Sequence, residues 1–322
     1  MNSMIQTVDL TKKFNDFVAN DHINLDVKEQ EIKCIVGENG AGKSTTMNIM
    51  TGYLGATEGQ VLIDGHDILK EPEEAKKNIG YLPEIPPLYM EMTVREYLEF
   101  AAELKGIKKD KIESQIEEVI RLAKLRDVEN RLIQNLSKGY KQRVGLAQAV
   151  LGFPEIIILD EPTVGLDPKQ IIEIRELIRK LAKKHTVILS SHILAEVREV
   201  CDYIMIISGG KLVASDTTEN LENMMSGKGQ IEVEAKASRD EMDHIIRRTG
   251  KIKEVKYRTS ASGITTAQIT AKGGEDIREE LFLAFSHADV PMLTLNQSKT
   301  TLEEIFLELT QGSGNRMIKE EK

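Results

Sequence analysis

A loop able to hold phosphate groups is the most informative feature of this sequence. Gly37-Glu38-Asn39-Gly40-Ala41-Gly42-Lys43-Ser44-Thr45 follows directly after the apolar run Ile32–Val36 and fits the pattern G-x-x-x-x-G-K-S/T in full. The glycines let backbone N–H groups turn toward phosphate oxygens, and a helix that begins near Lys43 points its positive dipole end at the same anion. Lys43 can reach the β- and γ-phosphates, and the Ser44 hydroxyl can coordinate Mg²⁺. The pattern predicts binding of a nucleoside triphosphate.

Two adjacent carboxylates follow a second apolar run. Asp160 and Glu161 come directly after Ile156–Leu159, and the carboxyl end of such a buried strand is where ligands of α/β sheets bind. We expect Asp160 to hold Mg²⁺ directly or through water. Glu161 would accept a proton from, or orient, the water that attacks the γ-phosphate. Acids at a solvated strand end are the alternative, which the phosphate-binding loop in the same chain disfavours.

Three further segments resemble motifs of the ATP-binding cassette (ABC) ATPases. The stretch Leu136–Arg143, which reads LSKGYKQR, is similar to the LSGGQ signature of that family. Thr163–Pro168, which reads TVGLDP, resembles the D-loop, and His192 after Thr186–Ser191 resembles the switch histidine. Together with the phosphate-binding loop they occur in the family order and span nearly all of residues 1–215.

The resemblance implies that two cassettes pair head to tail, as a homodimer or with another cassette, and enclose ATP between them. The signature would then contact the γ-phosphate of the ATP held by the opposite cassette, through Ser137, Lys138, Gly139 and Tyr140. A helix N-terminus at Ser137 suits such an anion, although an ordinary helix N-cap is the alternative. Lys138 and Tyr140 replace the usual Gly and Gln of the signature. Asp167 would connect the two sites across the dimer.

The resemblance also assigns residues around the nucleotide. His192 would hydrogen-bond the γ-phosphate and hold the attacking water near Glu161, and a structural histidine at a strand end is the alternative. Phe14 stands where the family stacks an aromatic ring on adenine, with Phe17 as a second candidate. Glu84 stands where the family usually has the Q-loop glutamine. Its carboxylate can accept from water or approach Mg²⁺ but repels the γ-phosphate unless a cation intervenes, so a solvated loop acid is the alternative.

Composition limits the class of protein. The 322 residues are 40% hydrophobic and 30% charged, as is ordinary for a globular protein, and the net charge of −9 disfavours nucleic acid as a partner. No apolar run approaches the roughly 20 residues that span a bilayer, and no signal segment opens the chain. We therefore expect a cytoplasmic protein that reaches a membrane only through a partner. Cys34 and Cys201 form no metal-binding pattern, and we expect both to be structural.

Alternating strand and helix patterns predict an α/β domain with a mixed, mainly parallel sheet in residues 1–225. The spacing of apolar residues from Ile112 to Ala123 predicts an amphipathic helix within a helical subdomain at about residues 85–150, and another helix follows Asp167-Pro168. The expected strands are Met4–Leu10, Ile32–Val36, Gln60–Ile63, Ile79–Leu82, Ile156–Asp160, Thr186–Ser191 and Tyr203–Ile207.

A second, smaller domain is expected at residues 230–311, after a flexible stretch at Met225–Gly229. Its pattern reads β-α-β-β-α-β with one added helix, the order of a ferredoxin-like α+β domain, and carries no catalytic constellation. We interpret it as a packing or dimerisation module, followed by a flexible tail at residues 312–322. Its expected elements are Ile231–Ala235, Arg239–Arg248, Ile252–Thr259, Thr265–Ala271, Ile277–Phe285, Val290–Leu295 and Leu302–Leu309.

One cassette with such a second domain and with Ser298–Leu309 near its end is similar to the ABC-2 exporter branch, which includes multidrug, antibiotic-resistance and gliding-motility systems. The stretch Tyr81–Tyr89 resembles the gliding-motility type. The resemblance implies an ATPase that uses Mg²⁺, lies at the inner face of the cell membrane and energises a separate multi-pass permease. Leu88 and Tyr89 would face that permease, or else pack beneath their own loop.

Other functions remain as alternatives. An importer subunit is the near one, although the second domain does not resemble the β-rich regulatory module common there. A non-transport ABC ATPase acting on ribosomes or DNA belongs to another class, and the acidic balance and the single cassette disfavour it. A nucleotide-dependent regulatory binder with little hydrolysis is opposed by the presence of Glu161 and His192.

Overall fold

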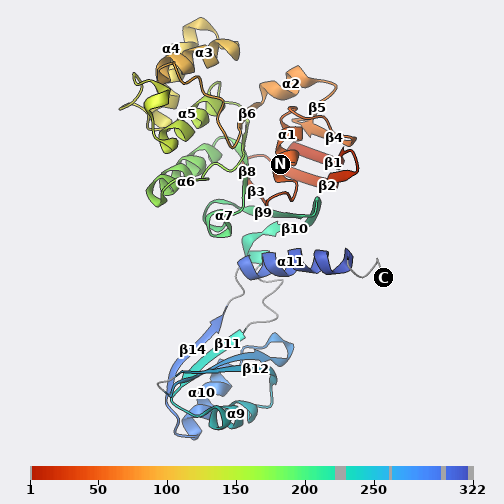
Figure 1. Cartoon of the computed structure of the whole chain (residues 1–322), viewed down its shortest axis with the longest axis vertical. Helices are drawn as coiled ribbons and strands as arrows, with labels where there is room; N and C mark the ends of the chain where they lie inside the picture. Colours follow the sequence, from red (N-terminus) through yellow and green to blue (C-terminus); the bar gives the residue numbers. More distant parts are fainter. Residues whose placement is uncertain (1, 222–229, 261–262, 299–301, 318–322) are drawn as a thin grey trace. The chain divides into compact units, whose positions relative to one another are not determined.

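The computed structural model describes residues 2–221, 230–260, 263–298 and 302–317. The chain forms two compact units, which we describe separately: the first is Met1–Asp216 together with Ser313–Lys322, and the second is Thr217–Gly312 (Figure 1). The boundary expected at Met225–Gly229 lies outside the described residues.

A six-stranded, mainly parallel sheet forms the centre of the first unit, in the order β10-β9-β3-β8-β7-β6. Its strands are β3 (Ile32–Val36), β6 (Ile79–Leu82), β7 (Ile156–Leu159), β8 (Thr186–Ser191), β9 (Tyr203–Ser208) and β10 (Lys211–Thr217). β3 pairs in parallel with β8 and β9, and β7 with β6 and β8. Every residue of β3, β7 and β8 is buried, as uninterrupted apolar runs predict for strands covered on both faces. The α/β class is confirmed.

An antiparallel sheet in the order β2-β1-β4-β5 completes the β structure of this unit. Its strands are β1 (Ser3–Phe14), β2 (Phe17–Lys28), β4 (Glu58–Ile63) and β5 (His66–Asp67). The sequence did not predict β2, because its register with β1 shifts at several points and interrupts the alternation of buried and exposed residues. Ile5 and Ile63 of this sheet share one apolar core with Ile35 and Ile188 of the parallel sheet, so the two sheets support each other.

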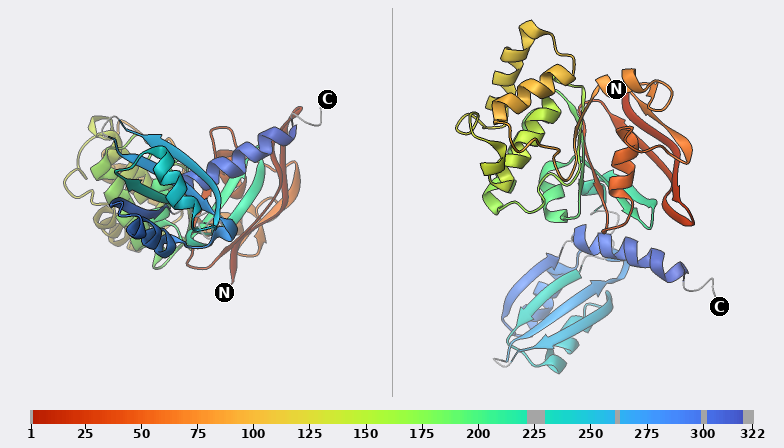
Figure 2. Two further views of the ribbon diagram at one scale, coloured as in Figure 1. Left: turned by 90° about the horizontal axis from the view of Figure 1, so that it is seen from below. Right: turned by 45° about the horizontal axis from the view of Figure 1, so that its top comes forward.

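Helices flank the parallel sheet, and α3, α4 and α5 lie on the opposite side of it from β1, β2 and β4 (Figure 2). The helices are α1 (Lys43–Met50), α2 (Pro72–Lys77), α3 (Val94–Leu104), α4 (Lys109–Leu122), α5 (Lys138–Val150), α6 (Pro168–Ala182) and α7 (Leu194–Val200), with a 3-10 turn at Ile133–Asn135. The apolar face predicted for α4 is buried at Ile116, Val119 and Ile120. The helix predicted after Asp167-Pro168 is α6, with Asp167 as its cap and Pro168 as its first residue.

The second unit has the element order predicted for it. Its elements are β11 (Gln230–Ala235), α9 (Arg239–Arg247), β12 (Ile252–Thr259), β13 (Thr265–Ala271), a 3-10 turn (Lys272–Gly274), α10 (Arg278–His287) and β14 (Met292–Ser298). They are followed by α11 (Leu302–Met317), which belongs to this unit as far as Gly312. The strands pair antiparallel in the order β12-β13-β11-β14, and a core that includes Ile231, Met242 and Phe285 packs beneath them. We interpret this unit as ferredoxin-like. Helix α11 includes the first residues of the expected tail, and residues 318–322 lie outside the described ones.

Candidate active site

Four strand ends converge at one edge of the parallel sheet. The phosphate-binding loop follows β3, Glu84 follows β6, Asp160 and Glu161 follow β7, and His192 follows β8. Because β3, β6, β7 and β8 run parallel, all four segments leave the sheet at its carboxyl edge. The topology therefore brings together residues that are more than 100 positions apart in the sequence.

The phosphate-binding loop has the backbone that its glycines predict. Gly42 caps α1 with φ of 106°, in the left-handed region, and a Cβ there would lie 2.5 Å from the carbonyl oxygen of Ala19. The Lys43 Nζ curls back over the loop, donating to the carbonyl oxygens of Gly37 at 2.9 Å and Glu38 at 3.2 Å. The loop thus holds a buried ammonium group where the phosphates of a nucleotide would lie.

Asp160 and Ser44 supply oxygen atoms next to each other. The Ser44 hydroxyl lies 3.4 Å from Asp160 Oδ1, and the Ser190 hydroxyl donates to the same oxygen at 2.5 Å. Among the described residues, no group of three His, Cys, Asp or Glu side chains could hold a metal ion by itself. A hydroxyl and a carboxylate oxygen suit Mg²⁺, which usually keeps several waters and takes further oxygens from substrate phosphates. The donor set therefore fits the predicted ion.

Glu161 is buried between a cation and a histidine. Its Oε1 lies 3.6 Å from Lys43 Nζ and its Oε2 lies 2.9 Å from His192 Nδ1. Its backbone is in the left-handed region, with φ of 47°, which is uncommon for a glutamate. The backbone N–H of Glu161 donates to the Ser190 hydroxyl at 2.9 Å, so Ser190 orients both Asp160 and Glu161. Such strained backbone is typical of functional sites.

These groups line an open cavity of about 420 Å³. Its lining includes Phe14, Phe17, Glu84, Glu161 and His192 together with the loop residues Asn39, Gly40, Gly42, Lys43, Ser44 and Thr45. Phe14 and Phe17 are partly exposed, at 46% and 62%, which leaves their rings available to a ligand. The size and the mixture of aromatic, cationic and acidic groups match a small-molecule site.

The signature residues lie outside that cavity. Ser137 caps α5 and accepts from the Tyr140 N–H at 3.4 Å, while the Tyr140 hydroxyl donates to Asp127 at 2.5 Å. The Lys138 ammonium reaches Gly165 of the D-loop in the same chain, where it occupies the space that a side chain would need. Gly139 is buried, and Gln170 of α6 fills the space next to it.

Two polar residues of the site were missed by the sequence analysis. Ser190 contacts both Asp160 and Glu161, and the only sign of it in the sequence is its place two residues before His192. Asn20 of β2 donates to the carbonyl oxygen of Gly42 at 3.2 Å and to the Thr46 hydroxyl at 2.8 Å, which braces the loop. Asn20 was missed because its strand was missed.

The loop after the site presents apolar side chains to solvent. Ile85 is 82% exposed and Tyr89 is 54% exposed, although the Tyr89 ring also meets Phe100 edge-on at 5.2 Å. Leu88 is only partly buried. Within the described ranges, no helix combines the length and apolar character needed to cross a bilayer.

Both cysteines are buried and unpaired, in agreement with a structural role. Burial and the neighbouring Cys201 thiol raise the pKa of Cys34 well above its ordinary value, so this thiol is poorly reactive.

Comparison with known proteins identifies the family. A model described as ABC transporter matches residues 20–164. The bacitracin transport ATP-binding protein BcrA of Bacillus licheniformis is 40% identical over 224 residues, covering 69% of this chain and 72% of that protein. This chain belongs to the ABC transporter family. The uncharacterized ABC transporter ATP-binding protein YcbN of Bacillus subtilis (strain 168) is 30% identical over 97% of this chain and 99% of its own length.

Solved structures of ABC cassettes share the fold of the first unit. An ATP-binding subunit of an ABC transporter matches with a TM-score of 0.64 and 30% identity, covering 69% of this chain and 93% of its own. The cassette MJ0796, in a dimeric post-hydrolysis state bound to ADP and Pi, matches with a TM-score of 0.61 and 28% identity over 66% of this chain and 98% of its own. The resemblance read from the motifs is confirmed: the chain is an ABC-type ATPase and the ATP-binding subunit of a transporter.

Proposed function

We propose that this chain hydrolyses ATP, with bound Mg²⁺, to drive a separate multi-pass permease of the ABC-2 exporter type. It would work in the cytoplasm, at the inner face of the cell membrane, as one of two paired cassettes. The exporter assignment is supported by relatives whose names refer to bacitracin transport and, with 37% identity, to probable multidrug transport by YbhF of Escherichia coli (strain K12).

The observation that carries the proposal is the contact of Glu161 with both His192 and Lys43 inside one cavity. A buried carboxylate that accepts a hydrogen bond from a histidine is placed to orient a water molecule and to accept its proton. His192 is 44% exposed on its side chain, so one edge of the ring is open to the γ-phosphate. Lys43 would stabilise negative charge on the β- and γ-phosphates.

Ser44 and Asp160 would hold Mg²⁺ at the phosphates, where the ion neutralises negative charge. Ser190 keeps the Asp160 carboxylate turned toward Ser44. Glu84 would take the place of the usual glutamine near the γ-phosphate, on the side where Mg²⁺ is bound. The bound cation would offset the repulsion between the Glu84 carboxylate and the phosphate. The adenine would stack on Phe14, with its neighbour Phe17 as the lesser contact.

The second half of each site would come from the opposite cassette. Ser137, with the Gly139 amide at the start of α5, presents a helix N-terminus to the γ-phosphate in trans. Lys138 and Tyr140 make contacts within their own chain, so we assign them to positioning this segment. Asp167, whose carboxylate caps α6, would lie at the junction of the two sites.

Affinity capture tests the transport function. The tagged full-length chain is recovered from detergent-solubilised membranes of its native cell, and co-purifying proteins are identified by mass spectrometry. A multi-pass membrane protein in stoichiometric amount is expected, and Ile85→Asp should abolish its recovery, because a charge in the exposed loop opposes apolar docking. Leu104→Asp, a change at a 72% exposed residue of α3, is the matched control. Recovery of ribosomes or DNA-bound factors in place of a membrane protein would contradict the proposal.

A further inference from the structure

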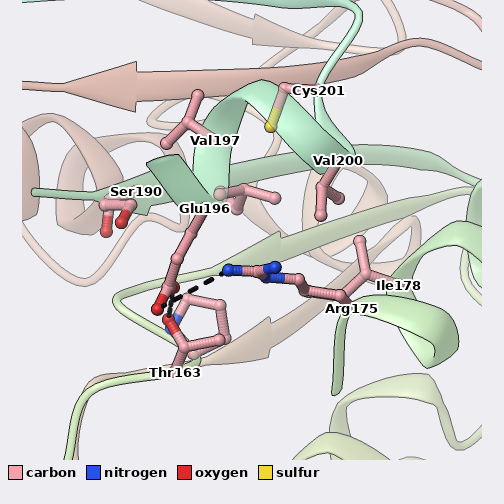
Figure 3. A pocket seen from close by; sticks show the side chains of 11 residues that line it. Thr163, Arg175, Ile178, Ser190, Glu196, Val197, Val200 and Cys201 are labelled. Atoms are coloured by element: carbon pink, nitrogen blue, oxygen red, sulfur yellow. Dashed lines mark hydrogen bonds and ion pairs between the residues drawn. The ribbon is translucent and has the colours of Figure 1, made fainter. Parts of the chain in front are cut away.

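A buried carboxylate joins the helix after the switch histidine to the D-loop. Glu196 of α7 accepts a hydrogen bond from the Thr163 hydroxyl at 2.5 Å through its Oε2. Its other oxygen, Oε1, lies 4.0 Å from the guanidinium of Arg175 on α6 (Figure 3). Arg175 also pairs with Glu199 at 2.6 Å. Three segments of the first unit, the D-loop, α6 and α7, thus meet at one side chain.

The surroundings make these contacts strong and their loss costly. Glu196 and Thr163 are 8% and 6% exposed, and they line a cavity of only about 20 Å³ together with apolar side chains that include Ile178 and Val197. Removing a charged carboxylate from water is unfavourable unless partners replace the lost hydration. In a site of low polarity the hydrogen bond from Thr163 is strengthened for the same reason. Packing alone does not require a glutamate at this position.

The hydrogen bond between Thr163 and Glu196 lies close in sequence to the contact between Glu161 and His192, so the two contacts and the chain segments between them form a closed ring. Thr163 stands two residues after Glu161, and Glu196 stands four residues after His192. Glu161 and His192 contact each other at 2.9 Å, and Thr163 and Glu196 contact each other at 2.5 Å. The chain after β7 and the chain after β8 are therefore tied at two points, one inside the nucleotide cavity and one behind it.

We propose that Glu196 is a positioning residue for ATP hydrolysis. Through Thr163 and α7, it holds the side chains of Glu161 and His192 in their positions relative to each other. The inference rests on the catalytic roles proposed above for those two residues. Without the hydrogen bond between Thr163 and Glu196, the segments after β7 and β8 are held together only near Glu161, so the geometry needed at the γ-phosphate is reached less often. ATP binding depends on the phosphate-binding loop and is unaffected. Arg175 supports the tie from the helix that begins at the end of the D-loop.

Steady-state ATPase kinetics of the full chain test this role. Thr163→Val keeps the side-chain shape but removes the donor, and Glu196→Gln keeps the shape but removes the charge. Each should lower kcat about 10-fold while KM for ATP changes by less than about 2-fold, as expected for a coupled, buried pair outside the binding loop. The kcat of the double variant should be no lower than that of either single variant. Thr163→Ser keeps the hydroxyl donor and should retain the wild-type kcat. Glu176→Gln, in an exposed pair with Lys124 at 3.7 Å, is the control and should match the wild type.

Thermal melting and nucleotide-binding stoichiometry of each variant separate positioning from folding. Wild-type kcat in both Thr163→Val and Glu196→Gln would overturn the proposal. Additive losses of kcat in the double variant would also overturn it. A loss of kcat that equals the loss of ATP-binding sites, and that Thr163→Ser shares, would do the same. Glu161→Gln and His192→Ala are measured alongside. If they lose turnover while the Glu196 and Thr163 variants do not, the positioning role alone fails; if they keep turnover, the proposed catalytic roles fail as well.

Discussion

The two units of this chain differ in what they bury. At the carboxyl edge of the parallel sheet, the first unit buries charged side chains, among them Lys43, Asp160, Glu161 and Glu196. In the described part of the second unit, the buried polar residues are two threonines, and one of them, Thr265, donates to a backbone carbonyl oxygen.

The difference separates catalysis from packing. Burying a charge costs free energy, which a structural domain avoids by using apolar side chains, as the second unit does around Phe285. A site that must stabilise phosphate charge and move a proton needs buried charged groups that compensate one another. The buried charged groups at this edge support the active site proposed there, and substitutions in both units test it.

Lys43→Ala should have the largest effect on turnover. The change removes the cation of the phosphate-binding loop and leaves Glu161 without its ion-pair partner. We expect kcat/KM for ATP to fall by at least about 10³-fold. Binding of a fluorescent ATP analogue should weaken in parallel, with Lys77→Ala, an exposed lysine paired with Glu74, as the control. Tight ATP binding and normal turnover in Lys43→Ala would contradict the claim that the buried charges of the first unit serve catalysis.

His192→Ala should lower kcat by about 100-fold, because the change removes the contact with Glu161 and, in the proposed mechanism, the hydrogen bond to the γ-phosphate. Its side chain is 44% exposed, so the melting temperature should not change. Initial rates at saturating ATP measure this effect. An unchanged kcat would contradict the proposed role in hydrolysis and favour the alternative, a structural histidine at a strand end.

Phe14→Ala should affect binding more than chemistry. Loss of a stacked ring should raise KM for ATP by about 10-fold, with little change in kcat. Phe17→Ala is the paired variant, since both rings line the cavity, and it should raise KM by less than about 2-fold. The reverse order of the two effects would assign the adenine contact to Phe17.

Phe285→Ala should leave kcat unchanged although it damages the second unit. The ring is fully buried, and its loss should destabilise that unit by about 3–5 kcal/mol. Differential scanning calorimetry and ATPase assays on the same preparation measure both effects. A fall in kcat larger than the fraction of unfolded protein would show that the second unit contributes to catalysis, and the contrast between the units would then be wrong.

Much of the carboxyl edge of the parallel sheet could be predicted from sequence, because its central strands are covered on both faces. β3 and β8 have the predicted bounds, and both are central strands that are buried along their whole length. β6 also has its predicted bounds, although it is the last strand of the sheet and only every second residue of it is buried. The loop, the acids and His192 follow those strands directly, so their convergence follows from the parallel topology.

Contacts between distant side chains could not be predicted in this way. β2 was missed because bulges break its alternation, and Asn20 was missed with it. Thr163 and Glu196 are 33 positions apart, and no sequence pattern around either residue predicts a buried hydrogen bond between them. Such contacts depend on how α7 packs on the sheet, which periodicity does not determine.

The most direct test of the central claim is the Glu161→Gln variant of the full chain in the presence of ATP and Mg²⁺. Glutamine keeps the shape of the side chain but cannot accept the proton, so hydrolysis should fall by about 10³-fold while ATP binding persists. Size-exclusion chromatography with light scattering should then show a dimer that retains two ATP molecules. Glu155→Gln, at the opposite end of β7, is the control and should hydrolyse ATP normally. Wild-type turnover in Glu161→Gln would contradict the assignment of Glu161 as the base.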